Sequence, residues 1–394
     1  MEPVYLDHNS TTPVCPEARG AIERGLAELW QNPSSAHRAG QAVRHAIESA
    51  RGSVARLIGV PARDLVFTSG ATESLRLGAM GVLGARTDAA RTQRRAIVTT
   101  PIEHEAVRDL CVWLLDRGEV DEVRELRITR QGLVDIDSLG SIDQTVALVC
   151  CMWANNETGV VQPIEAVGEA AHASGALCLC DATQWVGKVP TRVRTRRDPD
   201  GVPVDLLACS AHKMHGPKGV GALYIARGVP FRTPMPGTQE RERRGGTENV
   251  PGILGFGAAA EAALSWLDDE HHRARIASMR DAFEQRVVEL CPGASVNGAG
   301  AERLWNTTNI AFPRLEAEAI LLRLSERGVY CSAGAACSSG SLEPSPVLLA
   351  MGVPEAQAHG SLRFSLSRET TEDELERAAG IVAEAVEKLR SVGA

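Results

Sequence analysis

Six short segments between residues 65 and 225 are apolar along their whole length and rich in Val, Ile, Leu and Cys. They read LVFTS at 65–69, AIVTT at 96–100, ALVCCM at 147–152, ALCLC at 176–180, DLLACS at 205–210 and VGALYI at 220–225. Such strands are typical of a sheet that helices cover on both faces, and a helical pattern at 163–174 separates two of them. The sequence therefore predicts an α/β fold with a mainly parallel sheet, which binds ligands at the carboxyl ends of its strands.

The sequence changes in character from about residue 257 onward. A long helical stretch is followed by short strand-like pieces, TTNIAF and SLRFSL, and then by a last helical pattern at 371–390. That pattern has an acidic start and a basic end, which suits the helix macrodipole. We expect a second, smaller α+β domain here.

Composition excludes several classes of protein. The chain has 394 residues, 44% hydrophobic and 23% charged, as is usual for a soluble globular protein. Its net charge of -8 argues against direct binding of nucleic acid or of an anionic membrane. The N-terminus shows no secretory signal, and no apolar run approaches the length that spans a bilayer, so we expect a cytoplasmic protein. The arginine-rich segment 191–201 fits a solvated surface better than a docking site.

Ten cysteines are spread along the chain without any C-x-x-C pair, so neither a disulfide framework nor a metal site is expected. Two of them, Cys331 and Cys337, lie in CSAGAACSSGSLEP at 331–344. Small residues bury little apolar surface, which predicts a mobile surface loop whose thiols are free to react. The alternative is a flexible linker with two incidental cysteines.

Polar residues follow the strand-like segments with unusual consistency. GATES places Thr72 at an expected helix start, where a phosphate can bind, although Thr72 could also be a simple helix cap. WANNETG places Asn156 after the third segment, and DATQ places Asp181 and Gln184 after the fourth. A carboxylate after a buried strand is costly unless it meets a positive partner, such as a protonated heterocycle nitrogen. The alternative for Asp181 is a structural helix cap.

Lysine is scarce, and its positions are informative. The chain has only Lys188, Lys213, Lys218 and Lys388, while arginine is abundant. Arginine cannot form an imine, so a position that needs an amine nucleophile must keep lysine. Lys213 follows the fifth strand-like segment by three residues and is flanked by residues that could hold an anion, whereas Lys388 fits a surface lysine far better.

These pieces together describe pyridoxal phosphate chemistry, in which Lys213 would form the imine and Asp181 would keep the ring nitrogen protonated. His104, just beyond the second segment, is the candidate for stacking over the ring. The remaining expected contacts are Thr72, Ser210 and His212 with the phosphate, and Asn156 and Gln184 with the ring hydroxyl region.

Ten motifs also resemble, in order and spacing, the NifS/IscS-type cysteine desulfurases, of the class V aminotransferase group of fold type I pyridoxal phosphate enzymes. They are YLDHNSTTP, NPSSAH, FTSGATES, EHEAV, MWANNETG, DATQWVGKVP, SAHKMHGPKGVGALY, QERERRGGTEN, AGAACSSGSLEPS and SLRFSLSRETTEDEL. The resemblance runs from about residue 4 to about residue 390. Small departures, at His8, Ser10, Ala211 and Thr238, remove no catalytic group.

The resemblance implies a homodimer with its active sites at the subunit interface. It also implies a large cofactor domain, here 16–256, and a small domain formed by 1–15 and 257–394 with the catalytic cysteine loop. Cys337 matches the cysteine that receives sulfur, and no thiol is required at Cys331. The other implied roles are a phosphate contact for Ala71, a phosphate contact with the other subunit for Thr247, and substrate binding for Arg363 with Asn156.

The implied reaction converts L-cysteine to L-alanine and leaves a persulfide on Cys337, with His104 or the substrate itself as the base that takes the thiol proton. Its sulfur would pass to an acceptor protein, for which an iron–sulfur scaffold is one candidate. A selenocysteine lyase or another class V enzyme is the alternative, and it would not need Cys337. A non-catalytic sulfur carrier is a further alternative, which intact Lys213, Asp181 and Arg363 argue against.

Overall fold

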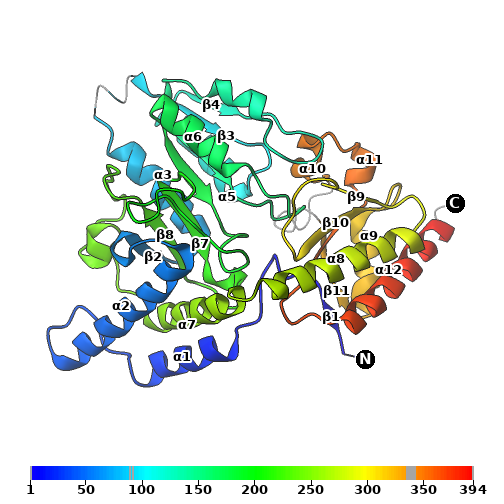
Figure 1. The fold of residues 1–394 in the computed structure, drawn as a ribbon, viewed down its shortest axis with the longest axis horizontal. Coiled ribbons are helices and arrows are strands. Elements are labelled where there is room, and N and C mark those ends of the chain that lie inside the picture. The colour runs from blue at the N-terminus through cyan, green and yellow to red at the C-terminus, as the bar shows by residue number, and fades with distance from the viewer. Residues whose placement is uncertain (1, 88–89, 91–92, 334–342, 393–394) are drawn as a thin grey trace.

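The larger part of the molecule is built on a seven-stranded sheet (Figure 1). The computed structural model describes residues 2–87, 90, 93–333 and 343–392. The strands of this sheet, in spatial order, are β2 (Leu65–Thr68), β8 (Gly221–Ile225), β7 (Leu206–Ser210), β6 (Leu177–Asp181), β5 (Val146–Met152), β3 (Ala96–Thr99) and β4 (Glu122–Glu125). Only β8 runs antiparallel to its neighbours. The predicted mainly parallel α/β sheet is confirmed.

Helices cover both faces of the sheet, which explains why its strands are apolar throughout. On β5, Leu148 and Cys150 belong to a core shared with α3 (Ala71–Gly84) and α5 (Glu105–Asp116). Val149 and Cys151 belong to the opposite core. The helices of that second face are α2 (Arg38–Ile58), α6 (Ile164–Ser174) and α7 (Val250–Leu267), with α1 (Pro16–Ala27) packed outside on α7.

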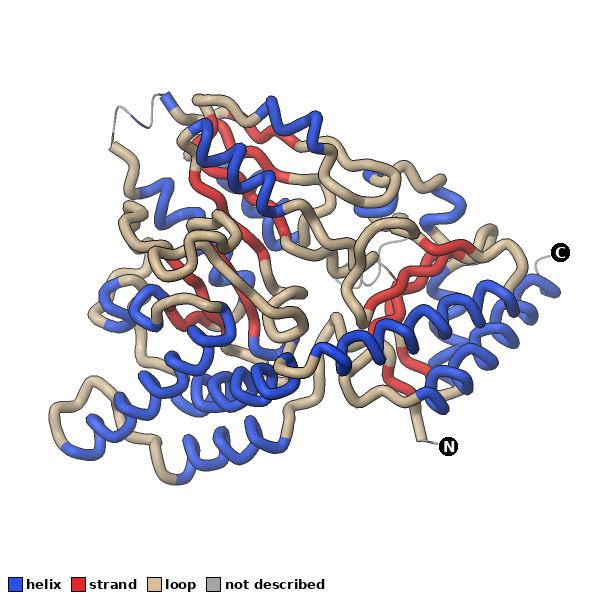
Figure 2. Tube along the Cα trace, in the orientation of Figure 1, coloured by secondary structure: helices blue, strands red, loops and turns tan. Residues whose placement is uncertain are grey.

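A smaller α+β unit with its own core occupies the other end of the molecule, where both chain ends lie (Figure 2). Its four-stranded sheet has the order β12 (Ser332–Ala333), β13 (Ser361–Ser365), β10 (Thr307–Ala311) and β9 (Ser295–Val296). A short parallel pair joins β1 (Val4–Tyr5) to β11 (Val329–Tyr330). The helices of this unit are α8 (Glu270–Leu290), α9 (Ala317–Glu326), α10 (Pro346–Ala350), α11 (Glu355–Ala358) and α12 (Glu372–Val392).

The segment after β1 crosses from the small unit to the large one. The backbone N–H of Thr12 donates to the carbonyl of His212 at 3.0 Å, and that of Cys15 donates to the carbonyl of His215 at 2.9 Å. The N-terminal residues therefore pass directly beside the turn that carries Lys213.

Helix α7 lies at the boundary that the sequence predicts between the two domains. The predicted boundary between residues 256 and 257 falls inside it, and its buried residues as far as Leu267 belong to the core of the large unit. By length and composition alone α7 could also cross a membrane, but 61% of it is buried inside the structure. Its apolar character is that of a core helix, since it packs against both α1 and α2.

The arginine-rich segment 191–201 is mainly a paired surface turn. Arg192 forms a bidentate ion pair with Asp198, with its Nη2 at 2.7 Å from Oδ1, and Arg194 pairs with Glu169 at 2.6 Å. These pairs satisfy two of its arginines locally, as the solvated-surface interpretation requires.

Candidate functional site

A cavity of about 1150 Å³ lies where the carboxyl ends of the parallel strands face the small unit. Ten residues that the sequence singled out line it together: Ala71, Thr72, His104, Asn156, Asp181, Gln184, Ser210, His212, Lys213 and Arg363. Thr247 is not among the lining residues. Cys337 lies outside the residues that the structure describes.

The Lys213 amine lies at the cavity wall beside the N-terminal segment. Lys213 sits in a 3-10 turn directly after β7. Its Nζ donates to two backbone carbonyls, those of Asn9 and Ser10, each at 2.7 Å. Neither Asn9 nor its carbonyl was predicted as part of the site, although the motif YLDHNSTTP that contains it was noted.

Asp181 ends β6 and presents a carboxylate to the cavity. Its Oδ1 accepts the backbone N–H of Thr183 at 2.9 Å. No α-helix begins here in the described chain, which removes the helix-cap alternative, and no ion pair of Asp181 is found among the described residues. A buried carboxylate of this kind suits a cationic ring nitrogen in the cavity.

The start of α3 offers donors for a phosphate. Gly70 precedes the helix, and a Cβ built on it would lie 3.8 Å from the Ser210 Oγ, so this hydroxyl lies close to the N-terminus of α3, where Ala71 and Thr72 are the first residues. His212 lies beside them, and its Nδ1 is 3.2 Å from the Thr11 Oγ1.

The imidazole of His212 is neutral at this end of the cavity. Burial, together with the smaller effect of the charges of Lys213 and Lys218, lowers the pKa of His212 to about 4. His212 can therefore hydrogen-bond a phosphate without adding a positive charge of its own.

His104 forms the N-cap of α5, and this fixes where its ring proton lies. Its Nδ1 accepts the backbone N–H of Ala106 at 3.1 Å, so a neutral ring carries its proton on Nε2. The preceding residue, Glu103, also lines the cavity and was missed by the sequence reasoning. Burial raises the pKa of the Glu103 carboxyl to about 8.

Arg363 on β13 brings a buried guanidinium from the small unit. Its Nη2 lies 2.6 Å from the Asp7 Oδ1 and 2.7 Å from the Ser10 Oγ, and its Nη1 donates to the carbonyl of Asn156 at 3.1 Å. The Nε has no hydrogen-bond partner among the described residues. A buried donor without a partner favours a ligand that carries an acceptor, such as a carboxylate.

Cys331 is less exposed than a surface loop would make it. The segment that follows pairs with β13 as β12, and the Cys331 side chain packs against the core of the small unit. Burial raises the pKa of this thiol well above its ordinary value. The expected loop therefore does not include residues 331–333, because Ser332 and Ala333 are held in a sheet.

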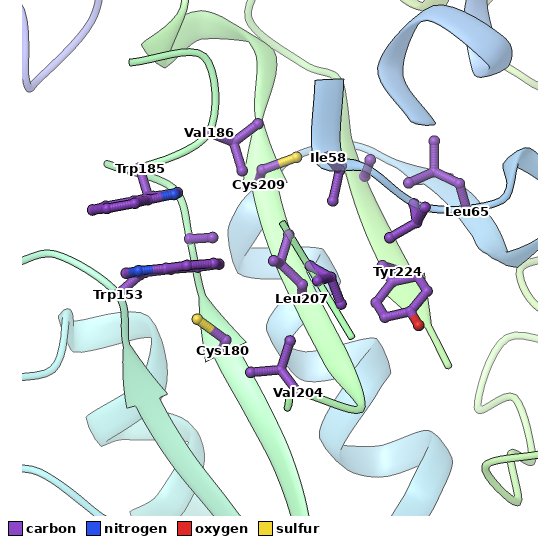
Figure 3. Close-up of a cluster of buried hydrophobic side chains, with 14 of the residues drawn as sticks. Ile58, Leu65, Trp153, Cys180, Trp185, Val186, Val204, Leu207, Cys209 and Tyr224 are labelled. Atoms are coloured by element: carbon purple, nitrogen blue, oxygen red, sulfur yellow. The ribbon is translucent and has the colours of Figure 1, made fainter. Parts of the chain in front are cut away.

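Two indoles support the strand ends beneath the site. Trp153 follows β5 and Trp185 follows β6, and their rings stack with centroids 4.7 Å apart and an angle of 7° (Figure 3). The backbone N–H of Trp153 also donates to the carbonyl of Asp181 at 2.9 Å. The stack ties the segments that carry Asn156, Asp181 and Gln184 to one another.

The donor and acceptor set of the cavity fits pyridoxal phosphate. It combines the Lys213 amine, the Asp181 carboxylate, which forms no ion pair among the described residues, and a helix N-terminus with neighbouring hydroxyls. These groups correspond to the aldehyde, the ring nitrogen and the phosphate of that cofactor.

Comparisons with known proteins agree with this chemistry. Residues 4–378 match the aminotransferase class-V family. A protein named cysteine desulfurase 2 from Trichormus variabilis is 45% identical over 394 residues, which cover 100% of this chain and 95% of that protein. A solved NifS-like protein has a TM-score of 0.88 at 34% identity, covering 98% of this chain and 100% of its own. A solved SspA in complex with cysteine has a TM-score of 0.79 at 30% identity, covering 93% and 100%.

Proposed function

Since the chain belongs to the class V aminotransferase family, and within it to the NifS-type cysteine desulfurases, we propose that Lys213 and Cys337 carry the conversion of L-cysteine to L-alanine. The observation that carries this proposal is the single cavity shared by Lys213, Asp181 and Arg363. Their amine, carboxylate and guanidinium suit a covalent attachment point, a ring-nitrogen partner and a substrate carboxylate. The cysteine bound by a solved relative supports L-cysteine as the substrate.

Pyridoxal phosphate is the cofactor of this enzyme class, and when bound it stores the electron pair that is released as the substrate Cα proton leaves. The residues that would hold it are Asp181 at the ring nitrogen, Ala71, Thr72, Ser210 and His212 at the phosphate, His104 over the ring, and Asn156 and Gln184 at the ring oxygen.

Lys213 and Arg363 position the substrate and move its proton. Lys213, once the substrate amine has displaced it, takes the Cα proton on its Nζ. Arg363 binds the substrate carboxylate, and its Nε is available because no partner for it exists among the described residues. His104 carries its ring proton on Nε2 and therefore acts as a donor there. The proton of the Cys337 thiol goes to another base, for which the substrate amine is the candidate.

The Cys337 thiolate then attacks the substrate sulfur. A sulfur–sulfur bond forms, the Cβ–S bond of the substrate breaks, and the electron pair of that bond returns to the carbon skeleton, which takes up protons to become alanine. The enzyme is left with a persulfide. We assign the next step to a thiol of an acceptor protein, of which an iron–sulfur scaffold is one candidate.

The test is to supply L-cysteine and to measure alanine and transferred sulfur together. Wild type should form both in equal amounts, whereas Cys337→Ala should keep bound cofactor and lose turnover. Cys331→Ser is the matched control, because Cys331 packs on the small core, and it should keep activity. Full turnover in Cys337→Ala, or a loss in Cys331→Ser as deep as in Cys337→Ala, would contradict the assignment.

We also propose that the enzyme is a homodimer. Thr247 does not line the cavity of its own chain, so a role at a phosphate requires a second subunit. The turn that leads to it is firmly anchored, since Glu240 accepts from the Arg51 Nη1 at 2.6 Å and from its Nη2 at 2.9 Å. Exposed apolar residues, Leu26 at 64% and Trp30 at 72%, supply surface that a second copy would cover.

A cytoplasmic location is part of the same proposal. The chemistry requires a reduced Cys337, and the cysteines within the described residues are free thiols. Fractionation of cells that produce the protein, with cysteine-dependent alanine formation as the readout, tests the location. Activity confined to a membrane or secreted fraction would contradict it.

A further inference from the structure

Lys188 is a buried lysine for which the reaction described above has no use. It lies in the turn after β6 and is 5% exposed. Its Nζ donates to the Gln184 Oε1 at 2.6 Å and to the Asn9 Oδ1 at 2.8 Å. No carboxylate pairs with this amine in the part of the chain that the structure describes. A lysine kept in such surroundings needs an explanation, because burial of an unbalanced ammonium is costly.

The contact with Lys188 determines what Gln184 can offer to a ligand. The Gln184 Oε1 accepts from Lys188, and the Gln184 Nε2 donates one hydrogen to the carbonyl of Asn9 at 3.0 Å. The reverse orientation of the amide would set two acceptors, Oε1 and this carbonyl, against each other. Gln184 lines the cavity, so the group that remains for a ligand is its second N–H, a donor.

The same amine fixes a second group beside Lys213. The Asn9 side chain is held through Oδ1 by Lys188, and its Nδ2 donates to the carbonyl of Asn156 at 3.1 Å and to the Thr307 Oγ1 at 2.9 Å. The carbonyl of Asn9 in turn accepts from the Lys213 Nζ at 2.7 Å. One buried amine therefore holds residues on two sides of the site.

We propose that Lys188 is a positioning residue, which holds the Gln184 amide so that it presents an N–H donor to the ring oxygen of the cofactor. A donor at that oxygen stabilises the anionic form of the oxygen. It therefore disfavours protonation of the imine nitrogen formed by Lys213, which shares a proton with the oxygen. The proposal rests on pyridoxal phosphate being the cofactor. It can be tested without substrate, so its failure is distinguishable from failure of the proposed desulfuration.

The groups that face Lys188 add positive charge or are neutral. Lys213 and Arg363 lie near enough that, after burial, their charges lower the pKa of Lys188 well below the ordinary lysine value. His8 and His215 lie in the same region, and burial lowers the pKa of each to about 4, which leaves them uncharged at neutral pH. The positioning role needs only the N–H groups of Lys188, which both its charged and its neutral form carry.

The test follows the visible absorbance of the bound cofactor as a function of pH in holoenzyme without L-cysteine. In Lys188→Met the midpoint of the absorbance change should rise by about one pH unit, because the ring oxygen loses a well-oriented donor. Lys188→Gln, which retains an N–H donor, should recover part of the shift. Lys388→Met, at an exposed position of α12, is the matched control and should leave the midpoint unchanged.

A double variant shows whether Lys188 acts through Gln184. Gln184→Met should raise the midpoint by itself, and Lys188→Met should add little in that background. A Lys188→Met holoenzyme with a wild-type midpoint would overturn the proposal. The proposal would also be overturned if Lys188→Met shifted the midpoint as much in the Gln184→Met background as it does in wild type. If Lys188→Met does not fold, the midpoint of Gln184→Met decides alone, and an unshifted midpoint there is equally fatal.

Discussion

A buried carboxyl group, that of Glu103, lies beside the cavity without a cation to balance it in the described part of the chain. Its Oε1 accepts the Thr100 hydroxyl and the backbone N–H of Met152, each at 2.8 Å, and its Oε2 has no partner among the described residues. Burial is the main reason that its pKa rises to about 8, and the charge of Asp181 adds to it. The native state therefore holds this carboxyl neutral at pH values where an unfolded chain ionises it.

This arrangement predicts a loss of stability at high pH. Because the folded pKa exceeds the unfolded one, the contribution of Glu103 is complete below about pH 4.5 and is lost as the pH rises through about 8. The free energy of unfolding of Glu103→Gln should increase relative to that of wild type as the pH rises, by at most on the order of 4 kcal/mol. Urea unfolding of both proteins at pH 5 and pH 9 measures this gain, and an equal difference at the two values would contradict it.

Residues near the site could be predicted from the sequence when they follow a strand directly. Asp181 and Lys213 stand out because a carboxylate and an amine come within three residues of the end of an apolar segment, and strand ends of a parallel sheet share one edge. Asn9 and Lys188 could not be predicted in this way. Their role arises only when the N-terminal segment packs beside the turn after β6, a contact between residues 179 positions apart.

Helix α7 packs so tightly against α1 that no side chain fits between them at one point. A Cβ added to Gly25 would lie 2.8 Å from the backbone Cα of Pro251, which cannot move away cheaply. Gly20 lies on the same helix and has nothing within 4 Å of its added Cβ. The two glycines form a matched pair, because they share a helix and differ in their surroundings.

We predict opposite effects for the two substitutions to alanine. Gly25→Ala should destabilise the protein by about 1–3 kcal/mol, because the methyl group forces α1 from α7. Gly20→Ala should stabilise it by about 0.5–1 kcal/mol, because alanine loses less conformational freedom in a helix. Urea unfolding measures both, and a Gly25→Ala protein as stable as Gly20→Ala would show that the α1–α7 contact is not tight.

The sequence predicted the buried strands of the large sheet well, but it did not predict the edge strand β4. Strand β5 is apolar because both of its faces are covered, whereas β4 reads EVRE at the edge of the sheet and is mostly exposed or half-buried. Its residues resemble those of a polar loop. The antiparallel direction of β8 was equally invisible, because composition carries no strand direction.

At the level of the whole molecule, we propose that two subunits together form each complete site. Lys213 of one chain should work with Thr247 of the other, since Thr247 does not line its own cavity. We predict that Lys213→Ala and Thr247→Ala proteins, each of low activity alone, regain activity when their subunits are mixed under exchange conditions. Half of the dimers would then be mixed, each with one intact site, which gives about a quarter of wild-type activity.

Size-exclusion chromatography with light scattering provides the control for this experiment. Both variants should remain dimers of wild-type mass, so that a regained activity reflects subunit exchange. A mixture that is no more active than its components, although exchange is demonstrated, would place both residues in the same subunit's site and contradict the shared arrangement.

In the proposed reaction sulfur leaves L-cysteine and arrives on Cys337, and peptide mass spectrometry can follow this transfer. Holoenzyme is treated with one equivalent of L-cysteine in the absence of reductant, blocked with an alkylating agent and digested. We predict that the peptide containing Cys337 gains the mass of one sulfur atom, while the peptide containing Cys331 does not, and that Lys213→Ala abolishes the gain. Alanine formation without added sulfur on Cys337, or with the sulfur on Cys331 instead, would show that Cys337 is not the sulfur acceptor.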